Sequence, residues 1–164
     1  MKLLIPTAEQ ISVLLKARKE TVAVAESSSG GLISAALLAV PGASAYFLGG
    51  AAVYTKEARS ALVGITDTEM KGLRSSSEPY AALLARTIRA RHGAVWGLAE
   101  TGAAGPTGNR YGDAAGHSCI ATSGPIERTL TLETGRGDRE ANMRAFALKA
   151  LEAFLEALQS AKTS

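Results

Sequence analysis

The stretch from Ser27 to Thr55 contains no charged side chain, and this feature restricts most strongly how the chain can fold. A segment of this length without charge has to be largely buried, either in a membrane or in a protein core. Pro41-Gly42 and Gly49-Gly50 interrupt it, and most of its residues are Ala, Gly and Ser. We therefore reject a membrane span and predict a buried helix, a turn and a buried strand in that order.

Strand and helix patterns also precede and follow the uncharged stretch. A short amphipathic helix around Ile11 to Leu15 leads into the apolar run from Thr21 to Glu26, which predicts a central strand. Ser28 or Ser29 is placed to cap the next helix, which Pro41 ends. A second strand is predicted from Ala45 to Tyr54.

The second half of the chain adds more alternating elements and then a hairpin. We predict helices from Lys56 to Val63 and from Glu78 to His92, strands at Ala94–Leu98, His117–Thr122 and Ile126–Thr134, and a final helix from Asp138. The final helix buries a stripe formed by Ala147, Leu151, Phe154 and Leu158. The order of elements predicts one α/β domain over residues 1–164, with a mixed sheet and helices on both faces.

The charged residues exclude some classes of function. There are 18 Lys and Arg against 15 Asp and Glu, and they are scattered rather than gathered into a basic arm. This pattern argues against nucleic-acid binding and favours anionic ligands only weakly. His92 and His117 lack the spacing of a metal site, so we expect no metal.

Cysteine content and the N-terminus bear on the compartment. Cys119 is the single cysteine, which excludes an internal disulfide and a multi-cysteine zinc site. A chain of this size without disulfides is typical of a reducing compartment, and the first ten residues do not form a secretory signal. We expect a cytoplasmic protein that does not associate with membranes.

The motif AESSSGG, residues 25–31, places three hydroxyls and two glycines where a strand turns into a helix. Free N–H groups at a helix start attract an anion, and glycine lets a ligand approach the backbone. A phosphate or a carboxylate fits there. An ordinary serine cap explains the same residues equally well.

Three further segments are candidates for chemistry. Ser44, Tyr54 and Lys56 are a possible nucleophile and base set, although a turn serine, an interface tyrosine and a surface lysine are the simpler interpretation. The glycine-rich loop that begins at Thr101 is long for a small domain, and it is either an anion cradle at a strand end or a mobile loop. Arg139, in the first turn of the final helix, opposes the helix dipole unless it contacts an anion.

These motifs, in the order AESSSGG, PGASAYFLGG, VYTKEAR, SEP, TGAAGPTG and GDR, resemble the CinA C-terminal domain family from about Thr21 to Phe154. The resemblance implies a three-layer α/β fold. It also implies hydrolysis of nicotinamide mononucleotide to nicotinate mononucleotide and ammonia, by a metal-independent serine amidohydrolase that needs no cofactor. A homodimer is the implied assembly.

The resemblance assigns roles to individual residues. Ser44 matches the nucleophile and Tyr54 the tyrosine beside it, while Ser28 and Ser29 stand where the family motif ESCTGG has cysteine and threonine. The residues implied to bind substrate are Glu26, Ser28, Ser29, Gly30, Gly31, Thr101, Gly102, Ala104, Gly105 and Arg139. The phosphate is expected at the helix start that follows Ser27.

The chain departs from the family pattern at Arg59, which replaces the active-site lysine. A guanidinium stays protonated, so Arg59 holds charge but cannot take the proton of a serine. The general base is then either missing or moved, and Lys56, three residues earlier, and Tyr54 are the candidates to replace it. The alternative function is a catalytically silent module that still binds a nucleotide.

Overall fold

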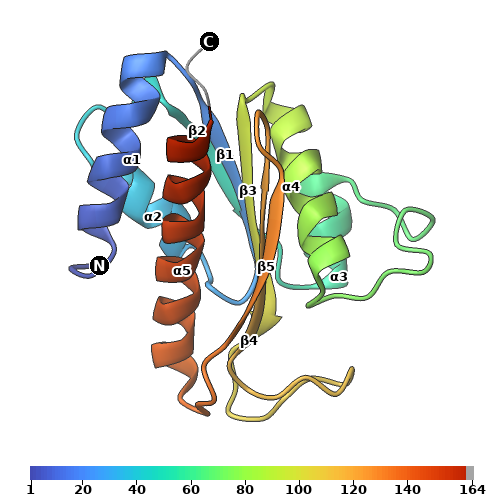
Figure 1. The fold of residues 1–164 in the computed structure, drawn as a ribbon. Coiled ribbons are helices and arrows are strands. Elements are labelled where there is room, and N and C mark those ends of the chain that lie inside the picture. Colours follow the sequence, from blue (N-terminus) through green and yellow to red (C-terminus); the bar gives the residue numbers. More distant parts are fainter. Residues whose placement is uncertain (162–164) are drawn as a thin grey trace.

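The computed structural model describes residues 1–161, whose strands form one five-stranded sheet (Figure 1). The strands are β1 (Val22–Glu26), β2 (Phe47–Ala52), β3 (Trp96–Ala103), β4 (His117–Ser123) and β5 (Arg128–Glu133), in the order β2-β1-β3-β4-β5. β1 pairs in parallel with β2 and β3, whereas β4 runs antiparallel to both β3 and β5. The predicted mixed sheet is therefore confirmed.

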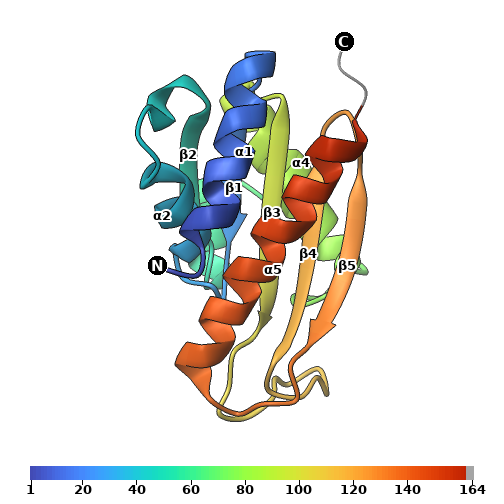
Figure 2. The ribbon, with the colours of Figure 1, turned by 60° about the vertical axis from the view of Figure 1, so that its left-hand side comes forward.

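Helices cover both faces of the sheet, as Figures 1 and 2 show. One face carries α1 (Ile5–Arg18), α2 (Leu32–Leu38) and α5 (Arg139–Ser160). The other carries α4 (Glu78–His92) and the short α3 (Lys56–Ala58), which continues as a π-helical turn at Arg59–Val63. The three-layer α/β architecture expected from the sequence is confirmed.

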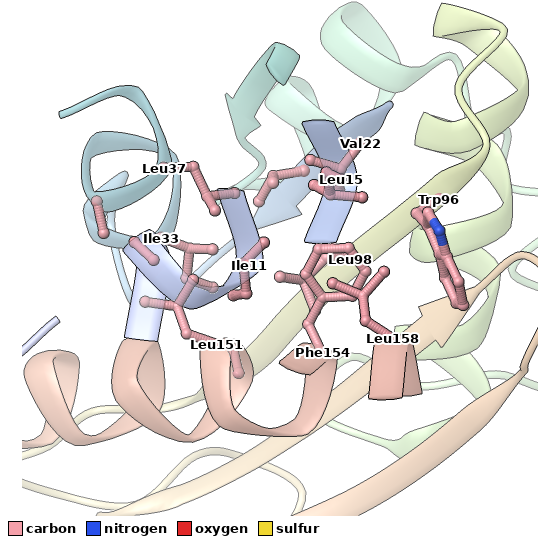
Figure 3. Packing of buried hydrophobic residues seen from close by; sticks show 14 of the residues in the cluster. Ile11, Leu15, Val22, Ile33, Leu37, Trp96, Leu98, Leu151, Phe154 and Leu158 are labelled. Atoms are coloured by element: carbon pink, nitrogen blue, oxygen red, sulfur yellow. The ribbon is translucent and has the colours of Figure 1, made fainter. Parts of the chain in front are cut away.

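The larger hydrophobic core lies between the sheet and the layer of α1, α2 and α5 (Figure 3). The stripe predicted on the final helix is buried there in full. Within this core the Trp96 ring meets Phe154 edge-on, with the ring centroids 5.6 Å apart. The Trp96 indole N–H donates to Glu20 over 2.7 Å, so the ring packs without losing its hydrogen bond.

The uncharged stretch folds as a helix, a turn and a strand, but the limits differ from those predicted, and β2 ends at Ala52 rather than at Tyr54. Ala43–Ala45 forms a 3₁₀ turn, so β2 begins only at Phe47. α2 begins after Gly31, and no serine side chain caps it. No helix among residues 1–161 is both long enough and apolar enough to cross a membrane.

β3 extends five residues beyond its predicted end at Leu98 and includes Thr101 and Gly102, which the sequence placed in a loop. A Cβ atom added at Gly102 would lie 2.3 Å from the carbonyl oxygen of His117 on β4. Glycine is needed here because two paired strands approach closely, rather than because the chain turns. The glycine content of this segment therefore misled the prediction.

Truncating one side chain of the α5 stripe tests the importance of this core. We expect Leu151→Ala to lower the free energy of unfolding by about 2–5 kcal/mol, because it removes buried methyl groups and leaves a cavity. Equilibrium urea denaturation measures the change. Val13→Ala, on the exposed face of α1, is the control and should stay within about 0.5 kcal/mol of the parent. Equal losses in the two variants would contradict the assigned core.

Candidate functional site

A cleft of about 610 Å³ opens where β1, β2 and β3 end. Its size falls within the range of roughly 300–1,000 Å³ that is usual for small-molecule sites, and the carboxyl ends of parallel strands are where such sites form. The lining residues are Ser27, Val53, Tyr54, Thr55, Lys56, Arg59, Asp67, Met70, Leu73, Arg74, Ser75, Ser76, Tyr80, Thr101, Gly102, Arg110 and Tyr111.

Cations outnumber anions in this lining. Lys56, Arg59, Arg74 and Arg110 contribute positive charge, and Asp67 is the acidic residue among the lining side chains. Asp67 accepts from Lys56 over 3.0 Å and from Arg59 over 3.2 Å. The hydrogen bond and charge of Lys56, assisted by Arg59, lower the pKa of Asp67, so its carboxylate is ionised. The cleft as a whole therefore favours an anionic ligand.

Arg59 is the most deeply placed of these cations, with 8% of its surface exposed. Its Nε is the one buried side-chain nitrogen or oxygen in residues 1–161 that has no hydrogen-bond partner. Tyr80 is buried beside it, and burial raises the pKa of that phenol despite the opposing charge of Arg59. The wall at Arg59 thus combines a fixed positive charge, a free N–H and a neutral tyrosine.

The helix start that follows β1 is occupied by a side chain of the protein itself. The Glu26 carboxylate accepts from the N–H groups of Gly31 (2.8 Å), Ile33 (3.1 Å) and Ser34 (2.9 Å). Gly30 and Gly31 have φ values of +66° and +97°, which the turn into α2 requires. The expected phosphate position at this helix start is therefore corrected, because its donors are already satisfied.

Glu100, which sequence analysis did not select, is the register partner of Glu26 on the neighbouring strand β3. It is fully buried and lies within hydrogen-bond distance of Ser28, Ser29 and Ser118. Burial raises its pKa, although the bonds from Ser28 and Ser29 oppose that shift. A lone acidic residue inside the apolar run WGLAETG was the signal by which the sequence could have identified it.

The Ser29 hydroxyl lies between the two carboxyl groups, 2.7 Å from Glu26 and 2.8 Å from Glu100. A hydroxyl has one proton, so it donates to one carboxyl oxygen and accepts from the other. The carboxyl group from which it accepts carries a proton, and burial, which raises the pKa of Glu100, favours the protonated form there. Glu26, Ser28 and Ser29 are buried parts of this network, and Ser27 is the residue of the motif that lines the cleft.

Arg139 joins two other predicted site segments. Its guanidinium donates to the Gly105 carbonyl over 2.6 Å and to the Tyr54 hydroxyl over 2.9 Å. Asp138 caps α5, as predicted, by accepting from the Ala141 N–H. Thr101 and Gly102 line the cleft, whereas Ala104 and Gly105 are buried beside it. Arg139 therefore fixes Tyr54 at the mouth of the site.

Ser44 lies apart from the other predicted catalytic residues. It is exposed in the 3₁₀ turn before β2, whereas Tyr54, Lys56 and Arg59 follow the opposite end of that strand. The strand between them spans about 17 Å at the usual rise per residue. One copy of the chain brings Tyr54, Lys56 and Arg59 together but does not bring Ser44 to them.

Several lining residues carried no sequence signal of their own. Arg74 donates to both oxygens of Asp113, over 2.7 and 3.2 Å, and this pair connects the segment before α4 with the loop between β3 and β4. Arg110 and Tyr111 stack on each other within that loop. Their loop was predicted to be functional from its length, but these side chains were not selected.

His117 anchors the floor of the site from β4. Its Nε2 donates to the Ser76 carbonyl over 2.8 Å, and its Nδ1 faces the Glu133 carboxylate. Burial lowers the pKa of His117, but Glu133, the Ser76 carbonyl and Asp113 together raise it above 6.5. Both ring nitrogens face acceptors, so the folded protein holds the imidazolium. Within residues 1–161, no group of three or more His, Cys, Asp or Glu is arranged to hold a metal ion.

Replacing one oxygen of the Glu26 carboxylate tests the role of the buried network. Glu26→Gln puts an amide N–H₂ against several N–H donors, so we expect the free energy of unfolding to fall by about 2–3 kcal/mol. Urea denaturation followed by circular dichroism measures this. Glu9→Gln, on the exposed surface of α1, is the control and should have little effect. An unchanged Glu26→Gln protein would show that the network does not hold α2.

The raised pKa of His117 predicts how stability depends on pH. Its contribution is complete below the pKa of the unfolded chain, and it disappears as the pH rises through the higher folded value. The parent should exceed His117→Gln in melting temperature at about pH 5.5, and the difference should narrow by about pH 9. His92→Gln, at the exposed end of α4, is the control. A difference in melting temperature that widens as the pH rises would contradict the conclusion that folded His117 is protonated.

The chain is similar in sequence to a known protein family and to several named relatives. The family model described as the CinA C-terminal domain matches residues 5–158. A CinA-like protein from Anaeromyxobacter sp. (strain K) is 36% identical over 92% of this chain and 37% of its own length. A CinA-like protein from Prochlorococcus marinus is 43% identical over 68% of this chain and 26% of its own length. The chain thus spans about a third or less of these two relatives.

Solved structures agree with this placement. The competence damage-inducible protein A (ComA) from Klebsiella pneumoniae has a TM-score of 0.90 and 26% identity, covering 97% of this chain and 99% of that one. The competence/damage inducible protein CihA from Agrobacterium tumefaciens has a TM-score of 0.85 and 28% identity, covering 96% of each chain. This chain therefore belongs to the CinA C-terminal domain family.

Proposed function

We propose that the protein is a nicotinamide-nucleotide amidohydrolase that converts nicotinamide mononucleotide to nicotinate mononucleotide and ammonia in the cytoplasm. The observation that carries the proposal is the cleft at the carboxyl edge of the sheet, with four cations against one lining carboxylate. Such a cleft suits a phosphate-bearing ligand of moderate size. Family membership adds support, because the ordered motifs of the sequence resemble those of this deamidase family.

The ligand is assigned to the cleft and not to the start of α2, where Glu26 occupies the donors. Arg74 and Arg110 would bind the phosphate near the mouth, since both guanidinium groups belong to residues that line the cleft. Thr101 and Gly102 line the inner wall at the end of β3.

The serine nucleophile would come from a second copy of the chain. β2 is an edge strand, and Ser44 before it and Tyr54 after it are equally far in sequence from Gly49. Antiparallel pairing of two β2 strands centred on that glycine would place Ser44 of each copy beside Tyr54 of the other. Leu48, a large apolar residue exposed on the same strand, would be covered. The expected homodimer thus becomes part of the catalytic proposal.

In the reaction, the Ser44 oxygen attacks the carboxamide carbon and its proton passes to a base. Tyr54 or Lys56 takes that role, because Arg59 stays protonated. The amide nitrogen leaves as ammonia with a returned proton, and water then hydrolyses the acyl-serine ester to the acid. Arg59 contributes positive charge to the site.

A silent nucleotide-binding module is the second candidate, and the observation that favours it is the buried Arg59 at the position of the family lysine. This candidate predicts ligand binding without turnover. Binding alone stabilises the fold by about 2.7 kcal/mol at a hundredfold ligand excess over the dissociation constant.

The test is ammonia release from nicotinamide mononucleotide by the parent and by two variants, Ser44→Ala and Tyr54→Phe. We expect each variant to lose at least about a hundredfold in rate. Ser160→Ala, at the end of α5, is the control and should retain the parent rate. Release that survives Ser44→Ala would contradict the serine mechanism.

Mixing the two inactive variants tests the shared site directly. If each site takes Ser44 from one copy and Tyr54 from the other, a reassembled equal mixture regains about a quarter of the parent activity. A site contained in one chain regains none. Thermal stabilisation by the nucleotide without any ammonia release would favour the silent module. The absence of both ammonia release and thermal stabilisation would refute both candidates.

A further inference from the structure

We infer that the cleft selects the acid form of its ligand, a pyridine nucleotide that bears a carboxylate, over the carboxamide form, and that Arg59 is the receptor for that carboxylate. The inference rests on the proposed function for the pyridine-nucleotide class alone. It adds the preference between the two forms, which neither the fold nor the cleft's charge determines by itself.

The first support is the unsatisfied donor. Arg59 is 8% exposed and lines the cleft, and its Nε–H has no acceptor among residues 1–161. A buried N–H without a partner carries a desolvation penalty. An acceptor on a bound ligand would remove that penalty once the ligand displaces the atoms that now shield Nε from solvent, so we assign the guanidinium of Arg59 as a binding position.

The second support is the local charge. Lys56 and Arg59 share Asp67, and both Lys56 and Asp67 are largely exposed, with 67% and 71% of their side-chain surface in contact with solvent. The buried guanidinium therefore shares its one carboxylate with a second cation, and that carboxylate is well solvated. A buried charge that is incompletely paired is stabilised most by an anion placed directly against it.

A carboxylate satisfies this position better than a carboxamide does. Both are planar, but the carboxylate offers acceptors on each oxygen and matches the fork of an arginine, with hydrogen bonds about twice as strong as neutral ones. A carboxamide presents one acceptor and an N–H₂ group that opposes the guanidinium. Arg74, whose side chain is 41% exposed, lies in a more open part of the lining and suits the bulkier phosphate.

Binding of four ligands by isothermal titration tests the inference. They are nicotinate mononucleotide, nicotinamide mononucleotide and the two corresponding ribosides, which lack the phosphate. All proteins carry Ser44→Ala, so that no amide is consumed. We expect the acid nucleotide to bind about tenfold more tightly than the amide, and the ribosides to keep that ratio. Arg59→Gln should bring the ratio close to one, whereas Arg128→Gln, on β5, should leave it unchanged.

Arg59→Lys provides a second measurement if Arg59→Gln does not fold, because it keeps the positive charge but loses the fork. The ratio of acid to amide affinity for Arg59→Lys should fall between the ratios for the parent and for Arg59→Gln. Equal or tighter binding of the amide by the parent would overturn the inference while leaving the proposed function intact. A preference absent from the ribosides, with Arg59→Gln weakening both nucleotides equally, would assign Arg59 to the phosphate instead. Failure of every ligand to bind would reject the proposed function itself.

Discussion

The paired carboxyl groups of Glu26 and Glu100 determine how the strand ends are arranged in this protein. They face each other across β1 and β3, and they are shared by the hydroxyl of Ser29. Two buried carboxylates at this separation would repel each other strongly, and a proton on one of them converts that repulsion into a hydrogen-bonded chain. The serine-rich turn is held in place because its hydroxyls and N–H groups complete this chain. Its sequence is therefore explained by folding as much as by ligand binding.

This arrangement decides where a ligand can go. With Glu26 occupying the start of α2, the remaining open surface near β1 lies on the other side of Ser27, among cations from three separate segments. Lys56 and Arg59 follow β2, Arg74 precedes α4, and Arg110 comes from the loop after β3. Only the folded sheet brings them together. Arg139, on α5, connects Tyr54 with that same loop, because its guanidinium donates to the Tyr54 hydroxyl and to the Gly105 carbonyl.

Local patterns in the sequence were sufficient for most of the fold. The stripe on α5, the start of α4 at Glu78 and the β4–β5 hairpin follow from periodicity and turn residues, which need no knowledge of distant parts of the chain. The predicted end of β3 was wrong because, in the sequence, glycines that permit close strand pairing cannot be distinguished from glycines in a loop. The positions of Arg74 and Arg110 depend on sheet order, whereas the separation of Ser44 from Tyr54 follows from the strand that lies between them. Strand order and direction come from long-range packing, which single residues do not encode.

The edge strand β2 has a further consequence for how the protein behaves in solution. Phe47–Ala52 contains no Lys, Glu or Pro, the residues that natural edge strands use to discourage unwanted pairing, and two of its six residues are glycine. An edge of this kind accepts another strand readily, whether the incoming strand is the correct one or not. In the proposed dimer this edge is covered, so dilution that separates the two copies would expose it, and the stability of the fold would then depend on protein concentration.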